Sequence, residues 1–413
     1  MNRLRRKLLA PYHYAWAVLS ALWYGFPARK LTVIGVTGTK GKSSVAEMLY
    51  AILTAAGHKT ALAGTIRFAI GDESRPNLFK MTLPGRGFIQ KFLAEALKKK
   101  CTYAVVEITS EAALQYRHRG LELDALVFTN LQKEHVESHG SVEKYFRAKF
   151  AIGEALANSE KRPRAIIANA DDARGGAFLA LPVEKHIPFS LADAADARTD
   201  ENGASFSYGG VHFSLPHPGN FSILNALAAV KTAETFGVPL QTCAKALGEL
   251  SRISGRVERI EAGQDFLAVV DYAHTPDSLR ALYGAFPNKR KICVLGNTGG
   301  GRDAWKRPEM GRIADEACEK VILTNEDPYD EDPRAIVDAM AKGMKRAPDI
   351  IMDRRSAIRT ALALARPGDA VLISGKGTDP FIMGPKGSKL PWSDAHIVQE
   401  ELKRLHFLRS GAS

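Results

Sequence analysis

A strand followed at once by a glycine-rich loop and a helix is the feature that most constrains the fold of this chain. The loop reads Val-Thr-Gly-Thr-Lys-Gly-Lys-Ser-Ser, residues 36–44, and it follows the apolar run Leu31-Thr32-Val33-Ile34. Glycines at such a turn let backbone N–H groups surround phosphate oxygens, and the next helix adds the positive end of its dipole. The pattern therefore predicts a nucleoside triphosphate site on an α/β fold.

The loop supplies most of the predicted ATP contacts. These residues are Gly38, Thr39, Lys40, Gly41, Lys42, Ser43 and Ser44. Lys42 would reach the β- and γ-phosphates, and the Ser43 hydroxyl would ligate Mg²⁺. The strict phosphate-loop pattern requires glycine at position 36, which is valine here, and Gly38 stands in its place. A plain glycine-rich turn would explain the glycines, but not the Lys42–Ser43 pair.

Composition is that of a soluble globular protein with two or three domains. The chain has 413 residues, of which 45% are hydrophobic and 25% charged. Its four cysteines are far apart and form no Cys-x-x-Cys pair, which predicts neither a disulfide framework nor a zinc site and fits a reducing cytoplasm. The net charge of +12 lacks a recognisable nucleic-acid module, so nucleic acid is not an expected partner.

Residues 1–30 form a basic and aromatic segment. Four basic residues lie between positions 3 and 7, and an apolar stretch rich in tyrosine and tryptophan runs from there to Pro27. Crossing a membrane takes roughly 20 uninterrupted apolar residues, whereas this stretch contains Pro11, His13 and Ser20. Two alternatives remain: peripheral contact of residues 1–27 with the inner face of the membrane, or a helix docked on the protein's own surface.

From Leu31 onward, apolar β-branched runs alternate with helical patterns. Strands are expected at 103–106, 125–128, 165–168, 267–270, 292–295, 321–323 and 371–373. Helices are expected near 225–236 and 240–250 and after Pro276, Pro308, Pro333 and Ser356. The alternation predicts a phosphate-loop central domain with a mainly parallel sheet at 31–254, followed by a Rossmann-like α/β domain at 255–413.

Glu107 is the first predicted metal ligand outside the loop. It ends the buried run Val105-Val106-Glu107, at the edge where a parallel sheet presents its ligands. A carboxylate beside a triphosphate is a suitable ligand for Mg²⁺. The alternative is a structural pairing with Lys42.

The spacing Thr-Gly-Thr-x-Gly-Lys-Ser resembles that of the Mur ligases, which build the peptide stem of the bacterial cell wall, and of their relative folylpolyglutamate synthase. Further motifs resemble the Mur branch that adds the third amino acid of the stem. They lie at 128–135, 145–149, 169–172, 255–258, 271–277, 299–303, 306–308 and 353–355. Folylpolyglutamate synthase is not expected to carry the motifs at 271–277 and 301–303.

The resemblance implies roles for five more residues. The histidine matching His135 helps to hold a second Mg²⁺, and the lysine matching Lys149 carries a carbamate that supports this metal. A carbamate makes electrostatic sense there, since a bare ammonium would be repelled by two Mg²⁺ ions. Arg256 and Asp271 would contact the phosphate or ribose of the nucleotide, with Asn225 near the adenine.

The resemblance also implies where the acceptor binds. Ser110, Gln115 and Arg117 match positions that touch the muramoyl peptide. Members of the family usually carry an N-terminal domain of their own for the uridine diphosphate, whereas only about thirty residues precede the first strand here. A UDP-linked and a lipid-linked acceptor are therefore both open.

The pocket for the incoming amino acid departs from the diaminopimelate pattern Asp-Asn-Pro-Arg, because this chain has Glu326-Asp327-Pro328-Tyr329. Loss of the arginine removes a bidentate partner for a second carboxylate. Arg302 matches the arginine that holds the amino acid's own carboxylate. Glu326, Asp327 and Asp379 are predicted to face a side-chain ammonium, so lysine or ornithine is the expected substrate.

The implied chemistry is activation of a carboxylate by ATP through an acyl phosphate, followed by attack of an amine. The chain is expected to act as a monomer in the cytoplasm. One alternative is a related amide ligase that glutamylates folate or another carboxylate acceptor. The other is a non-catalytic scaffold with a ligase fold, recruited to the membrane by its N-terminus.

Overall fold

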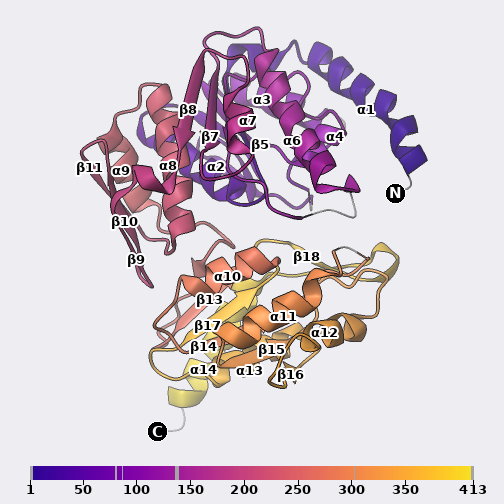
Figure 1. Ribbon diagram of the computed structural model, residues 1–413, viewed down its shortest axis with the longest axis vertical. Helices are drawn as coiled ribbons and strands as arrows, with labels where there is room; N and C mark the ends of the chain where they lie inside the picture. The colour runs from indigo at the N-terminus through magenta and orange to yellow at the C-terminus, as the bar shows by residue number, and fades with distance from the viewer. Residues whose placement is uncertain (1–2, 80, 86, 135–138, 302, 411–413) are drawn as a thin grey trace. The chain divides into compact units, whose positions relative to one another are not determined.

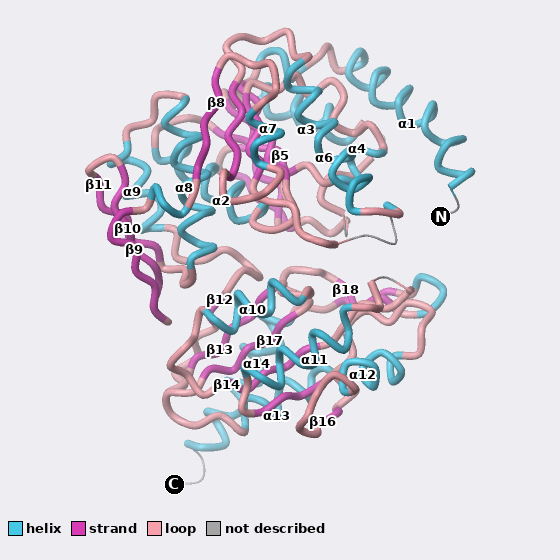
Figure 2. Tube along the Cα trace, in the orientation of Figure 1, coloured by secondary structure: helices cyan, strands magenta, loops and turns pink. Residues whose placement is uncertain are grey.

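The computed structural model describes residues 3–79, 81–85, 87–134, 139–301 and 303–410 (Figures 1 and 2). It divides into two compact units. The first unit comprises Met1–Arg198, Ser205–Leu215 and Asn220–Leu250, and the second comprises Thr199–Ala204, Pro216–Gly219 and Ser251–Ser413.

The first unit is built on an eight-stranded sheet with the order β4-β3-β2-β5-β1-β6-β7-β8. The strands are β1 (Thr32–Thr37), β2 (Thr60–Ala63), β3 (Arg67–Ile70), β4 (Glu73–Pro76), β5 (Tyr103–Glu107), β6 (Ala125–Phe128), β7 (Ala165–Asn169) and β8 (Lys185–Phe189). In this order, the pairs in the row β2-β5-β1-β6-β7-β8 are all parallel. Strands β3 and β4 add an antiparallel edge beside β2. A separate three-stranded sheet contains β9 (Ala195–Asp200), β10 (Gly203–Tyr208) and β11 (Val211–Leu215).

Helices cover both faces of the large sheet (Figure 1). They are α1 (Arg3–Trp23), η1 (Pro27–Lys30), α2 (Lys42–Ala55), α3 (Phe88–Lys98), α4 (Ser110–Leu114), α6 (Val142–Ala157), α7 (Gly175–Leu179), η2 (Leu191–Asp193), α8 (Asn220–Thr235) and α9 (Leu240–Glu249). Helices α2 and α8 pack on one face, and α3, α6 and α7 pack on the other. Central strands are therefore buried on both faces, as their continuous apolar sequences predict.

The sheet order places the phosphate loop at its centre. Strand β1 lies between β5 and β6, with Val36 opposite both Glu107 and Val127. Since the three strands are parallel, their carboxyl ends meet at one edge of the sheet. The loop after β1, the end of β5 and the segment after β6 are thereby brought together.

The N-terminal helix α1 has a docked face and an exposed face. A Cβ atom at Gly87 would lie 2.7 Å from Ser20 Cβ, and one at Gly120 would lie 3.1 Å from Ala21 Cβ, so α1 packs closely on the first unit. Large hydrophobic side chains are exposed elsewhere on α1, and these are Tyr12, Tyr14, Trp16, Leu19, Leu22 and Trp23. Within the described residues, no helix combines the length and the hydropathy that spanning a membrane requires.

The second unit has a six-stranded sheet with the order β12-β13-β17-β14-β15-β16, parallel except for β12. The strands are β12 (Glu258–Arg259), β13 (Leu267–Asp271), β14 (Lys291–Leu295), β15 (Lys320–Leu323), β16 (Asp349–Ile350) and β17 (Ala370–Ser374), with a separate hairpin of β18 (Phe381–Met383) and β19 (Lys389–Pro391). The helices are α10 (Pro276–Gly284), α11 (Lys306–Ala317), α12 (Pro333–Ala341), α13 (Arg354–Ala363), η3 (Pro385–Gly387) and α14 (Asp394–Ser410). Side chains of α13 and α14 form one apolar core with the sheet.

The predicted α/β class is confirmed, with two mainly parallel sheets in the expected chain order. The expectation that no disulfide forms is wrong, because Cys293 and Cys318 are bonded. Cys293 lies on β14, and Cys318 follows the crossover helix α11, which returns the chain to the strand beside β14. Their spacing in the sequence does not reveal this proximity. Cys101 and Cys243 are buried free thiols.

Candidate active site

The phosphate loop requires both of its glycines. Gly38 has a φ of 144° and Gly41 a φ of 81°, values that residues with a side chain rarely adopt. A Cβ atom at Gly38 would lie 1.9 Å from Thr129 Oγ1, and one at Gly41 would lie 2.3 Å from Asn225 Oδ1. The loop therefore fits tightly between the segment after β6 and helix α8, and Asn225 lies against it.

Hydrogen bonds fasten this loop to the end of β6. The amide of Thr39 donates to Asn130 O at 2.8 Å, and the amide of Lys40 donates to Asn130 Oδ1 at 2.9 Å. Thr129 Oγ1 donates to Lys40 O at 2.6 Å. These bonds fix the backbone before any ligand arrives, which is the preorganisation that phosphate binding needs.

Lys42, Ser43 and Glu107 meet at the start of α2. Lys42 Nζ donates to Thr39 O at 2.8 Å, so its ammonium is held over the loop. Ser43 Oγ lies 3.1 Å from Glu107 Oε2 and 3.2 Å from Oε1, and the amide of Thr65 donates to Oε2 at 2.9 Å. Glu107 itself is buried.

This donor set fits Mg²⁺. A hydroxyl and a carboxylate supply hard oxygen ligands, and Mg²⁺ at nucleotide sites takes only one or two protein ligands besides phosphates and water. Among the described residues, no group of three or more His, Cys, Asp or Glu side chains forms a metal site. Ser43 and Glu107 could hold such an ion, and this role stays a prediction.

Lys149 is buried beneath the phosphate loop. Its Nζ donates to Gly38 O at 2.6 Å and lies 4.6 Å from the centre of the Tyr145 ring. Burial holds the pKa of Lys149 well below its ordinary value, and the Lys42 ammonium lowers it further. The neutral amine, which is the nucleophilic form of a lysine, is therefore favoured over the ammonium more strongly here than in water.

Two contacts near Lys149 escaped the sequence analysis. Tyr145 OH lies 3.2 Å from Thr39 Oγ1, so the tyrosine connects α6 to the loop. Lys40 Nζ forms an ion pair with Glu134 Oε1 at 3.2 Å. Glu134 stands in the motif at 128–135 and Tyr145 in the motif at 145–149. Neither could be assigned a role from the sequence, because the direction of its side chain was not known.

Ser44 and Ser110 are two further predicted residues of the first unit. Ser44 is buried in the first turn of α2. Ser110 Oγ lies 3.2 Å from His139 Nε2, at the start of α4. His135 lies outside the described residues, so its metal role stays a prediction.

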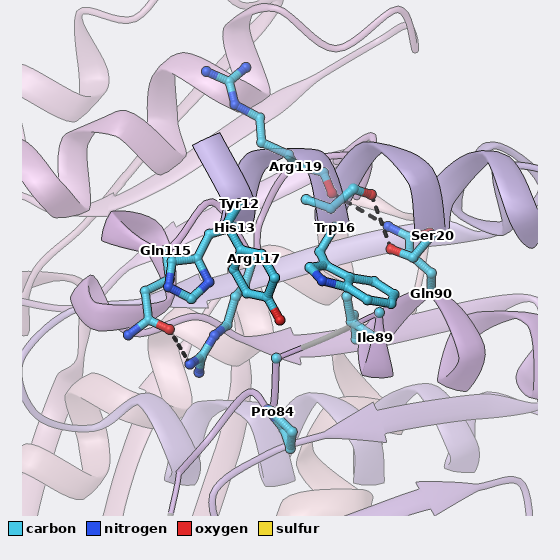
Figure 3. Close-up of a pocket in the computed structure, with 13 residues that line it drawn as sticks. Tyr12, His13, Trp16, Ser20, Pro84, Ile89, Gln90, Gln115, Arg117 and Arg119 are labelled. Atoms are coloured by element: carbon cyan, nitrogen blue, oxygen red, sulfur yellow. Dashed lines mark hydrogen bonds between the residues drawn. The ribbon is translucent and has the colours of Figure 1, made fainter. Parts of the chain in front are cut away.

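Gln115 and Arg117 face helix α1 (Figure 3). Arg117 donates from Nη1 to Leu83 O and from Nη2 to Gln115 Oε1. Gln115 Nε2 in turn donates to Glu111 Oε1 at 2.8 Å. These two predicted acceptor residues are thus joined to each other.

Arg256 and Asp271 lie together in the second unit. Asp271 accepts hydrogen bonds from the amides of Val257 and Ala273, each at 2.7 Å, and so ties the segment before β12 to the end of β13. The Arg256 guanidinium stacks over the Tyr272 ring at 4.6 Å. Contacts within the second unit therefore hold both side chains in place. Their contact with the nucleotide stays a prediction.

The three predicted acidic residues also lie together in the second unit, around a lysine. Lys376 Nζ donates to Asp327 Oδ1 at 2.8 Å and to Asp379 Oδ2 at 3.1 Å. Glu326 accepts a hydrogen bond from Thr298 at 2.9 Å, and its burial raises the pKa of the carboxyl group. The sequence analysis missed that Lys376, in the same Gly-Lys-Gly-Thr-Asp motif as Asp379, partly neutralises this group.

A second buried ion pair borders this acidic group. Arg354 donates from Nε and Nη2 to both oxygens of Asp394, at 2.8 and 2.6 Å. Tyr329 has a φ of 54° and donates its amide to Met383 O. Arg302 lies outside the described residues, and its contact with the amino acid stays a prediction.

Comparison with known proteins decides the family. Residues 36–233 match the model of the Mur ligase middle domain, and residues 255–377 match that of the Mur ligase, glutamate ligase domain. A UDP-N-acetylmuramyl-tripeptide synthetase of Roseiflexus sp. (strain RS-1) is 38% identical over 95% of this chain and 82% of its own. The chain belongs to the Mur ligase family. It is an ATP-dependent ligase that forms C–N bonds in peptidoglycan synthesis, and the family depends on Mg²⁺.

Other relatives sharpen the comparison. A UDP-N-acetylmuramoyl-L-alanyl-D-glutamate–2,6-diaminopimelate ligase of Gloeobacter violaceus is 37% identical over 94% of this chain and 80% of its own. A solved structure with the same ligase name has a TM-score of 0.63 and 29% identity, covering 91% of this chain and 79% of that one. Folylpolyglutamate synthase of Mycobacterium tuberculosis has a TM-score of 0.72 over 91% of this chain and 96% of its own, but only 17% identity, so it shares the fold alone.

Proposed function

We propose that this ligase adds an amino acid to the free carboxylate of a muramoyl dipeptide, through an acyl phosphate. The observation that carries the proposal is the assembly of Lys42, the Ser43–Glu107 pair and Lys149 around one phosphate loop. The names of the relatives, which specify muramoyl peptide ligases, support the same substrate class.

The reaction needs no nucleophile from the protein. The acceptor carboxylate attacks the γ-phosphorus of ATP, the bond to the β-phosphate oxygen breaks, and ADP leaves. The amine of the incoming amino acid then attacks the acyl phosphate, and phosphate leaves as the amide forms and a proton is lost. Mg²⁺ held by Ser43 and Glu107 would offset charge on the transferring phosphoryl group. Lys42 adds a fixed positive charge at the same place.

Lys149 is proposed to carry a carbamate. A neutral lysine amine attacks CO₂, one proton is lost, and the product is an anionic carbamate. The lowered pKa of Lys149 supports this step, because an ammonium has no lone pair to attack with. The product would stand beside Lys42 and the metal position as a negative group, where His135 is proposed to assist.

For the incoming amino acid we infer a basic L-amino acid, lysine or ornithine. Asp327 and Asp379 pair with Lys376, and the charges of Lys376 and of Arg354, which itself pairs with Asp394, both act on Glu326. Carboxyl groups therefore outnumber cations in this group. A second carboxylate, as in diaminopimelate, would be buried beside these acids without the arginine that the family pattern supplies. That burial favours lysine by roughly 100-fold. Arg302 is proposed to hold the carboxylate common to all of these substrates.

Helix α1 is proposed to rest on the inner face of the membrane. Leu19, Leu22 and Trp23 lie in the last turns of α1 and are 55 to 84% exposed. Four basic residues precede them in the sequence, and they complement anionic headgroups. Trp23→Glu should abolish sedimentation with anionic vesicles. Equal sedimentation of parent and variant would exclude this contact.

The ligase proposal is tested by a substrate matrix. ADP release and product mass are measured with UDP-muramoyl dipeptide and with a folate acceptor, each with lysine, ornithine and meso-diaminopimelate in competition. We expect turnover only with the muramoyl acceptor, and preferential incorporation of lysine or ornithine. Preference for diaminopimelate would contradict the amino-acid assignment alone. Absence of turnover with the muramoyl acceptor would contradict the proposed function. A monomeric mass in analytical ultracentrifugation is expected throughout.

A further inference from the structure

A loop of the first unit exposes three large apolar side chains. Leu78, Phe79 and Met81 follow the edge strand β4 and are 60%, 52% and 47% exposed. Among the residues whose side chains the structure describes, large hydrophobic residues are exposed at six positions of α1, at these three positions and at four others. Exposed apolar side chains that gather in one region are typical of a surface that binds a partner.

Hydrogen bonds around Asn77 fix the shape of this loop. The buried Asn77 side chain donates to Gly64 O at 2.9 Å and to Met81 O at 3.1 Å. The amide of Phe79 donates in return to Asn77 Oδ1 at 3.0 Å. The loop is therefore ordered with its apolar side chains at the surface, and binding through them would lose little conformational entropy.

The loop borders the part of the first unit on which α1 is packed. The Phe79 ring contacts the ring of Phe88 at the start of α3, with centroids 5.5 Å apart. Gly87 lies just before Phe88, and it packs closely on Ser20 of α1. The exposed loop and the exposed last turns of α1 are thus joined through the start of α3.

The charges beside these apolar groups are basic. No acidic residue occurs before Glu47 in the sequence. The exposed Arg75 lies over the Phe68 ring at 5.9 Å, and this ring contacts that of Phe79, with centroids 6.1 Å apart. The acidic residue Glu73 pairs with Ile70, next to the turn at the other end of the β3–β4 hairpin. Apolar side chains flanked by basic groups match the acyl chains and anionic headgroups of a membrane surface.

We propose that Leu78, Phe79 and Met81 insert into an anionic membrane surface together with the exposed end of α1. The inference rests on the membrane contact proposed for α1, and it adds a second point of attachment. Attachment through one helix would leave the first unit free to rotate about that helix, whereas two elements fix one orientation of the unit on the lipid.

The test is sedimentation of the full chain with vesicles of phosphatidylglycerol and phosphatidylcholine. Leu78→Glu should weaken vesicle binding about 10-fold, because the leucine side chain leaves the lipid and a carboxylate meets anionic headgroups. Leu78→Ser removes the apolar side chain without adding a charge and should weaken binding less. Leu390→Glu is the matched control, since it makes the same change at a leucine of β19 that is 57% exposed, and it should bind as the parent does.

Thermal unfolding of the variants should match that of the parent, because both leucines are exposed. Equal vesicle binding by the parent, Leu78→Glu and Leu78→Ser would overturn the inference and leave the contact of α1 in place. An equal loss in Leu78→Glu and Leu390→Glu would overturn it as well, since net charge alone would then explain the loss. A parent dimer that Leu78→Glu dissociates, without vesicle binding, would assign the surface to a second copy.

Failure of the proposed function is seen in other measurements. A parent protein that sediments with no vesicle would contradict the contact of α1 and of the loop together. Failure of the ligase reaction would show as absence of ADP release by the parent, whereas sedimentation needs no substrate.

Discussion

The phosphate loop and the acidic group of the second unit are built in opposite ways. The loop is one continuous segment whose shape is fixed by glycines and by backbone hydrogen bonds to Asn130. The acidic group comes from two loops far apart in the sequence, and Lys376 holds it together. One site is therefore encoded locally, whereas the other exists only after the sheet has formed.

The two sites also differ in charge. The Lys42 ammonium lies over the loop, where a triphosphate would compensate its charge. Carboxylates gather around Lys376, where an incoming ammonium would compensate the excess. Under the proposed function Lys42 acts on the substrate, whereas Lys376 pairs with neighbouring carboxylates, so removal of a charge should act on catalysis in the first site and on stability in the second.

The largest effect is expected at the loop. Lys42→Met removes the positive charge over the phosphates and should lower kcat by about 1,000-fold, without changing the unfolding midpoint. Steady-state ADP release and urea unfolding test this. Lys98→Met, on the exposed side of α3, is the matched control, and it should keep the activity of the parent. An equal loss of activity in both variants would contradict a specific role of Lys42.

The counterpart in the acidic group is Lys376→Met. It removes the ammonium that pairs with Asp327 and Asp379 and should lower the free energy of unfolding by about 3 kcal/mol. Urea unfolding measures the loss. The exposed Lys386→Met provides the control. A loss below about 1 kcal/mol would mean that Lys376 does not stabilise the group.

Lys149→Ala should lower kcat by about 100-fold, because the carbamate is lost. Added formate or acetate should restore part of the activity by placing a carboxylate in the space, whereas chloride should not. In the parent protein, activity should fall as the pH drops through the lowered pKa of Lys149, since protonation stops carbamate formation. Full activity of Lys149→Ala would show that Lys149 has no part in catalysis. Lys144→Ala, on the exposed side of α6, should behave like the parent.

The smallest expected effect is a pH dependence of stability. Burial lowers the pKa of His118 to about 4, against an ordinary value near 6.5. Between these values the unfolded chain binds a proton that the folded chain does not, so stability is lost as the pH falls. His118→Leu should remove about 2 kcal/mol of that loss between pH 6.5 and 4.5. The exposed His212→Leu should leave the dependence unchanged, and parallel curves for parent and His118→Leu would contradict the assignment.

The same contrast explains what the sequence could predict. Strands β5, β6, β7, β13 and β14 were expected within a residue of their observed ends, because buried parallel strands are continuous apolar runs. Strand β9 reads Ala-Asp-Ala-Arg-Thr-Asp and is fully exposed, and β4 reads Glu-Ser-Arg-Pro, so neither has a pattern that indicates a strand.

The residues of the candidate site show the same difference between local motifs and contacts made across the fold. Lys42, Ser43 and Glu107 follow from a local motif and from a strand end. Lys376 and Tyr145 could not be predicted, because their roles depend on the directions of side chains across the fold. The sequence left membrane contact and docking on the protein as two alternatives for the N-terminal segment, and the structure shows α1 packed closely on Gly87 and Gly120.

The central claim is that this ligase activates the acceptor carboxylate as an acyl phosphate. The direct test is a muramoyl dipeptide whose reacting carboxylate carries two ¹⁸O atoms, incubated with ATP, Mg²⁺ and lysine. The account predicts that each phosphate released with product carries one ¹⁸O, which mass spectrometry detects. Amide formation with unlabelled phosphate would contradict it.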